Sequence, residues 1–203
     1  MKRVAIGLRM HSGWGVLVAI SGDADSAEIM DRRRIVVTDP KVPGANQPYH
    51  YAENVGLPEA ENYLANCAAV SERLAVAALS EVVRELARRE GRIVGAAILL
   101  ASGRPLPSLS KILPSHALIH AAEGEFFRQA VRKACECLKI SATAVAERQL
   151  DERAKAAFGS ATSRVQRRVS TLGSSIGPPW TKDHKAAAIA ALTTLGQVSE
   201  SWK

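Results

Sequence analysis

Short apolar runs alternate with long amphipathic segments along the chain, and the two periods together predict an α/β protein. Three short runs come first, at residues 4–8, 16–20 and 35–38. Gly13 and Gly15 separate the first two runs and supply the backbone freedom that a tight turn needs. We therefore predict a β-hairpin and a third strand, followed by an irregular, proline-rich stretch at residues 39–58.

Two long helices and two further strands follow. Residues 59–89 carry apolar side chains at helical spacing, and residues 92–100 are almost uninterrupted in their apolar character, as in a strand buried on both faces. After a Pro- and Ser-rich loop at residues 101–114, a second long helix begins behind Ser115 as its N-cap and leads into a fifth strand at residues 140–146. The last predicted helices cover residues 151–158, 161–172 and 181–195.

The second long helix carries a candidate site on one face. At 100° per residue, a single stripe contains His116, His120, Glu123, Phe127, Val131, Ala134 and Leu138. The later part of this stripe is typical of a core, and we expect protein to cover its polar beginning as well. A polar group that is buried without a partner costs about 1–3 kcal/mol, so the histidines and the glutamate must find partners.

Metal binding is one hypothesis for this stripe. His116 and His120 have the i, i+4 spacing that many zinc sites use, and Glu123 lies one turn further on as a third ligand. The pattern His-x₃-His-x₂-Glu lacks the glutamate directly after the first histidine that zinc peptidases of this kind use, which argues against a protease. In the alternative interpretation, one histidine packs or caps the helix and Glu123 pairs with an arginine such as Arg128 or Arg9.

Composition and charge narrow the class of protein. The chain has 203 residues, 47% of them hydrophobic, so we predict one domain that spans residues 1–203. The formal charge of +7 permits a nucleic-acid partner without requiring one. Three cysteines cannot all pair within the chain, which indicates a reducing compartment. Polar residues interrupt the apolar start and no other run approaches the roughly 20 apolar residues of a membrane span, so we expect a cytoplasmic protein.

Two local sequences resemble a known family. VAIGLRMHSGWGVLVAI is similar to the first hairpin of the crossover-junction endodeoxyribonucleases, in which a strand ends in Gly-x-Asp and a Thr-Gly-Tyr-Gly-Val turn follows. DHKAAAIAAL is similar to their closing Asp-Ala-Ala-Asp-Ala-Leu helix. Together with the element order, the resemblance implies the ribonuclease H-like fold. That fold is an α/β domain with a mixed five-stranded sheet, three leading antiparallel strands and helices on both faces.

The same resemblance implies a nuclease site from which most acids are missing. Nucleases of this fold hold two metal ions roughly 3.5–4 Å apart with three or four converging carboxylates. Arg9 stands where the family has its first-strand aspartate, and the fourth strand ends at Leu100 without an acid. Asp183 matches the first closing acid, while Ala186 stands in place of the second. We therefore predict that two-metal nuclease activity is lost, and Asp183 is either a remaining catalytic acid or a cap of the last helix.

Two functional hypotheses follow. In the first, the protein is a relative of the junction nucleases that contacts nucleic acid through its arginines. In the second, His116, His120 and Glu123 form a catalytic or divalent-metal site, or Arg9, Arg104 and Lys111 join His116 to bind a small anionic ligand near the N-terminus of the second long helix.

Overall fold

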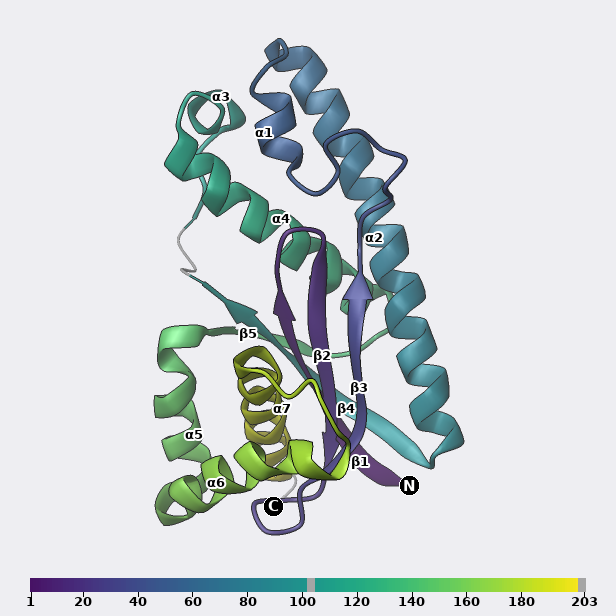
Figure 1. Cartoon of the computed structure of the whole chain (residues 1–203), viewed down its shortest axis with the longest axis vertical. Coiled ribbons are helices and arrows are strands. Elements are labelled where there is room, and N and C mark those ends of the chain that lie inside the picture. Colours follow the sequence, from purple (N-terminus) through teal and green to yellow (C-terminus); the bar gives the residue numbers. More distant parts are fainter. Residues whose placement is uncertain (102–104, 201–203) are drawn as a thin grey trace.

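One mixed sheet of five strands lies at the centre of the fold (Figure 1). The computed structural model describes residues 1–101 and 105–200. The strands are β1 (Lys2–Met10), β2 (Trp14–Ser21), β3 (Glu28–Val36), β4 (Gly91–Leu100) and β5 (Ala142–Ala146). Their order in the sheet is β3-β2-β1-β4-β5, with β1, β2 and β3 antiparallel and with β4 parallel to both β1 and β5. This topology confirms the predicted α/β class and the three leading antiparallel strands.

Helices cover both faces of this sheet (Figure 1). The long helices are α2 (Leu57–Arg88), α4 (His116–Cys137) and α7 (Lys182–Glu200), and two shorter ones are α5 (Leu150–Phe158) and α6 (Thr162–Leu172). Side chains of β1 alternate between two cores. Ile6 and Leu8 pack in the core that contains residues of α2 and α4, whereas Ala5 packs with residues of α6 and α7.

Helix α7 lies directly on the backbone of β1 at Gly7. A Cβ atom built on Gly7 would lie 1.8 Å from the carbonyl oxygen of Ala187, so no other residue fits here without moving the helix. This contact sets the position of the first turn of α7 relative to the carboxyl end of β1.

The turn between β1 and β2 is tight, as predicted. The backbone N–H of His11 donates to the carbonyl oxygen of Trp14 at 2.7 Å, and Gly13 has a positive φ of 78°. The turn places His11 and Trp14 beside Arg9, at the end of the sheet where the parallel strands β1, β4 and β5 terminate.

Three local predictions were wrong. The third strand begins at Glu28 and not at residue 35. The prediction missed its first part because β3 is an edge strand whose charged side chains hide the alternation of polar and apolar positions. The proline-rich stretch contains a short helix, α1 (Pro48–Ala52), and the later loop contains another, α3 (Leu109–Ile112). Both short helices pack on α4 and α2 at one end of the molecule.

The predicted stripe on α4 is buried only in part. Glu123, Phe127 and Val131 are buried, in agreement with the sequence. His116 and His120 are exposed, contrary to our expectation, because the first turns of α4 extend beyond the sheet and contact α1 and α3 instead (Figure 1).

The described residues show neither a disulfide nor a membrane-spanning helix. Cys67 and Cys135 are buried free thiols, and Cys137 is an exposed one. Within residues 1–101 and 105–200, no helix combines the length and the apolar content that crossing a bilayer requires.

Candidate functional site

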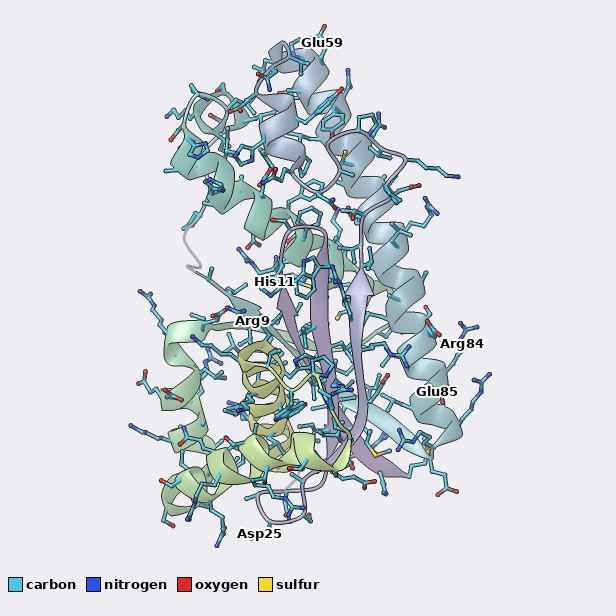
Figure 2. The ribbon with its side chains drawn as sticks, in the orientation of Figure 1. Arg9, His11, Asp25, Glu59, Arg84 and Glu85 are labelled. Atoms are coloured by element: carbon cyan, nitrogen blue, oxygen red, sulfur yellow. The ribbon has the colours of Figure 1, made fainter. Side chains whose placement is uncertain are left out.

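Arg9, at the carboxyl end of β1, binds two acidic side chains (Figure 2 shows its position). Its Nε donates to Oε1 of Glu147 at 2.9 Å, and its Nη2 donates to Oε2 of the same side chain at 3.0 Å. Its Nη1 donates to Oδ1 of Asp183. Glu147 directly follows β5, in a 3₁₀ turn (Glu147–Gln149), and Asp183 lies in the first turn of α7. Two parallel strands and one helix therefore converge on this guanidinium.

The Arg9 network is only partly solvated. The side chains of Arg9, Asp183 and Glu147 are 22%, 20% and 34% exposed. Hydrogen bonding to Glu147 raises the pKa of Arg9, although burial acts in the opposite direction. The guanidinium therefore stays charged and pairs with both acids. A metal ion approaching these carboxylates would have to displace Arg9, since a guanidinium offers donors and no acceptor.

The network continues from Asp183 toward the edge strand β3. Nε2 of His11 lies 2.9 Å from Oδ2 of Asp183, and the His11 ring stacks on Trp14 with ring centroids 4.4 Å apart. The guanidinium of Arg34 lies 4.2 Å from the centroid of the Trp14 ring, in a cation–π contact. Beside these groups is a hollow of about 450 Å³ whose lining includes Trp14, Arg32, Arg34, Pro179, Thr181 and His184.

His184 forms part of this hollow and binds the residue before α7. Its Nδ1 accepts the backbone N–H of Thr181 at 3.2 Å and lies 2.7 Å from the Thr181 hydroxyl, which resembles a capping box. Burial lowers the pKa of His184, the guanidinium of Arg32 lowers it further, and Asp183 opposes them. The accepting nitrogen and the lowered pKa both indicate a neutral imidazole at neutral pH.

A second candidate site lies at the N-terminal end of α4. Nε2 of His120 lies 3.0 Å from Nε2 of His116. The ring of His50, from α1, has its centroid 4.8 Å from that of His120 and 5.3 Å from that of His116. One potential ligand atom from each of the three histidines lies within 4.8 Å of the others. His50 is partly buried and the other two are exposed.

Glu123 contacts His50 and is not one of the grouped ligands. Its Oε1 accepts the ring Nδ1 of His50 at 2.9 Å and the backbone N–H of His50 at 3.3 Å, and its side chain is only 3% exposed. The interpretation in which Glu123 pairs with Arg128 or Arg9 was wrong, because Arg128 pairs with Glu125 and Arg9 with other acids. The structure places His50 beside the two predicted histidines, where the sequence suggested Glu123.

Arg9 and His116 do not share a site, contrary to the anionic-ligand grouping. The side chain of Arg9 lies on the α7 face of the sheet, whereas His116 begins α4, which packs on the opposite face. The grouping failed because alternate side chains of a strand point to opposite faces. Lys111 is exposed in α3, and Arg104 lies outside the described residues.

Sequence reasoning missed His11, His50 and Glu147. A signal existed for Glu147, because it directly follows the fifth predicted strand and the carboxyl ends of parallel strands meet at one edge. His11 was visible only as an interruption of an apolar run. His50 stands among prolines, and nothing in the local pattern indicates that it folds onto the start of α4.

Comparisons with known proteins show the fold. No protein-family model matches the sequence, and the comparison with curated proteins gives no match. Among solved structures, "T. thermophilus RuvC in complex with Holliday junction substrate" has a TM-score of 0.53 and 14% sequence identity, over 98% of this chain and 96% of that chain. The "Thermus thermophilus RuvC structure" has a TM-score of 0.52 and 14% identity over the same shares. This chain therefore has a ribonuclease H-like fold similar to that of RuvC.

Proposed function

We propose that this protein, which has a ribonuclease H-like fold, binds nucleic acid but does not cleave it by two-metal chemistry. The absence of two-metal cleavage rests on the pairing of Arg9 with Glu147 and Asp183 at the carboxyl edge of the sheet. Two observations support nucleic-acid binding. The fold is similar to that of a protein solved in complex with a Holliday junction, and the formal charge of +7 attracts polyanions.

Two-metal hydrolysis needs carboxylates that are free to hold ions. Glu147 and Asp183 are both bonded to Arg9, and Asp183 also contacts His11. At about 4 Å and an effective dielectric constant of about 20, the repulsion between a guanidinium and a divalent ion amounts to roughly 8 kcal/mol. We therefore expect Mg²⁺ not to occupy this edge while Arg9 is present.

The contact surface that we propose lies along the same edge. Arg148, Lys182 and Lys185 flank the Arg9 network in sequence, and none of these three forms a salt bridge with any acid among the described residues. Trp14 and the exposed Arg34 border the hollow next to them. Stacking of one base on an aromatic ring is worth about 1–3 kcal/mol, and a base would gain it at Trp14 by displacing His11 or Arg34 from the ring. This surface therefore supports binding by charge and stacking without base-specific contacts.

Fluorescence anisotropy with labelled four-way, duplex and single-stranded DNA tests the binding half. Binding should weaken with salt, with log K falling by roughly 0.9 per log unit of salt for each duplex phosphate neutralised. Replacing Arg148, Lys182 and Lys185 by alanine should reduce this slope by about three.

A matched control removes the same charge elsewhere. The triple alanine variant of Arg73, Arg84 and Arg88 changes three arginines on α2, where Figure 2 shows Arg84 on the other side of the molecule from Arg9. It should keep most of the affinity and the slope. Equal losses in the two triple variants, or no binding at low salt, would refute the proposed surface.

Incubation of a labelled four-way junction with Mg²⁺ or Mn²⁺ tests the catalytic half. The wild-type protein should leave the junction intact. Cleavage that Asp183→Asn abolishes would show that the carboxyl edge is a working metal site, and the proposal would then be wrong.

The geometry does not support the alternative hypothesis of a small anionic ligand. Its residues Arg9 and His116 lie apart, and the donors of Arg9 are already engaged by carboxylates. An increase of Tm with inorganic phosphate that Arg9→Met abolishes would favour this alternative, because a ligand stabilises the state that binds it.

A further inference from the structure

We propose that His50, His116 and His120 bind one late first-row divalent transition-metal ion, with Zn²⁺ as the ion of best fit. The site is independent of nucleic-acid binding, because it lies between α1 and the start of α4 and not at the carboxyl edge that contains Arg9. It joins two helices that are 66 residues apart in the chain at the ligand positions His50 and His116.

The spacing of the three rings already approaches that of a metal site. Zn–N bonds of about 2.0–2.1 Å in a tetrahedral site place ligand nitrogens roughly 3.4 Å apart. Nε2 of His116 and Nε2 of His120 are 3.0 Å apart, and the three potential ligand atoms lie within 4.8 Å of one another. Binding one ion would require the longest separations, up to 4.8 Å, to shorten to about 3.4 Å, and the exposed rings of His116 and His120 leave room for this adjustment.

The orientation of His50 is the strongest argument for a ligand role. Its Nδ1 lies 2.9 Å from Oε1 of the buried Glu123, and the same oxygen accepts the backbone N–H of His50. A carboxylate in this place holds the proton on Nδ1 and leaves Nε2 free as an acceptor. Histidines that bind metals commonly have such a partner, which fixes the ring and raises its basicity.

The donor set selects the class of ion. Three imidazole nitrogens suit Zn²⁺, Ni²⁺ or Cu²⁺, whereas Mg²⁺ and Ca²⁺ require oxygen ligands. His116 and His120 are exposed, so a fourth position faces solvent and would hold water or an external ligand. A bound ion would tie α1 to α4 and so stabilise this end of the fold.

Titration calorimetry with Zn²⁺ and, separately, with Mg²⁺ tests the proposal on the full chain. The test requires a Cys137→Ala background, because that exposed thiol is itself a potential Zn²⁺ ligand. One Zn²⁺ per chain should bind, Mg²⁺ should not, and Tm should rise with Zn²⁺ by mass action. His50→Ala and His120→Ala should each lower the Zn²⁺ affinity by more than about 100-fold, because each removes a direct ligand and not only a supporting group.

Two further variants distinguish a three-histidine site supported by Glu123 from Zn²⁺ binding by a chance pair of exposed histidines. Glu123→Gln should weaken Zn²⁺ binding by about 10- to 100-fold while leaving one ion per chain. His11→Ala removes a histidine elsewhere and should leave the affinity unchanged. Because His120 is exposed, His120→Ala should fold as the parent does, which circular dichroism checks. If Zn²⁺ does not bind, or if His50→Ala binds it as tightly as the parent, the three histidines form only a hydrogen-bonded cluster and the proposal is overturned.

Discussion

Replacing Arg9 by methionine tests whether this side chain holds the carboxyl edge of the sheet together. Methionine keeps an unbranched stem and removes every donor. In the wild-type protein, three nitrogens of Arg9 donate to the carboxylates of Glu147 and Asp183. Without the guanidinium, these two acids are left as neighbouring like charges that are partly shielded from water.

The expected loss can be bounded from the exposure of the pairs. A hydrogen bond to a charged group contributes about 1.5–3 kcal/mol net, whereas an exposed ion pair contributes at most about 1 kcal/mol. The side chains of Arg9, Asp183 and Glu147 are 22%, 20% and 34% exposed, which places each pair between these limits. The two bonds to Glu147 count as one bidentate pair. Two pairs of this kind give a decrease of about 3 kcal/mol in the free energy of unfolding.

Urea denaturation of both proteins at neutral pH measures this decrease. Adding Glu147→Gln and Asp183→Asn to the Arg9→Met variant should recover much of the lost stability, because the uncompensated charges disappear together with their partner. A loss below about 1 kcal/mol for Arg9→Met alone would mean that the pairs are screened surface contacts. The reasoning that Arg9 holds the carboxyl edge of the sheet together would then fail.

Three further predictions concern the same side of the sheet. Gly7→Ala should lower the free energy of unfolding by about 3 kcal/mol, because the added Cβ collides with the backbone of Ala187. As a control measured by the same urea titration, Gly196→Ala in α7 should be neutral or stabilise the protein by up to about 1 kcal/mol. The pKa of His184 is lowered in the folded protein, so its contribution to stability is full above the ordinary pKa of about 6.5 and is lost as pH falls through the lower folded pKa. His184→Asn keeps a hydrogen-bond acceptor but does not titrate. It should therefore reduce the difference between the unfolding free energies measured at about pH 7.5 and about pH 5.5. Trp14→Ala should weaken binding of single-stranded DNA by about 1–3 kcal/mol in anisotropy titrations without changing the salt slope, and a change in slope alone would exclude stacking.

The fold was predictable where side chains alternate between water and core, or where they avoid water altogether. Residues 93–100 identified β4 because a central strand is covered on both faces. The edge strand β3 has one open side, and Asp31, Arg32, Arg33 and Arg34 along it obscure any period of two. The sequence pattern predicts only its apolar end, from Ile35.

The candidate sites were harder to predict because they join distant residues. The sequence showed Arg9 in place of an acid, but the hydrogen bond between Arg9 and Asp183 spans 174 positions and depends on how α7 lies on β1. The histidine pair on α4 was found from its i, i+4 spacing. The third histidine was not, since His50 belongs to a five-residue helix within a proline-rich segment.

The surroundings of Trp14 have a practical consequence. His11 stacks on its indole and Arg34 lies over the same ring, so the environment of this chromophore depends on two groups that a bound polyanion would contact. Displacement of Arg34 by a phosphate would alter the emission of the indole. Because the chain has three tryptophans, the difference in intrinsic fluorescence between the wild-type protein and a Trp14→Phe variant provides an unlabelled optical probe of the proposed binding at this edge.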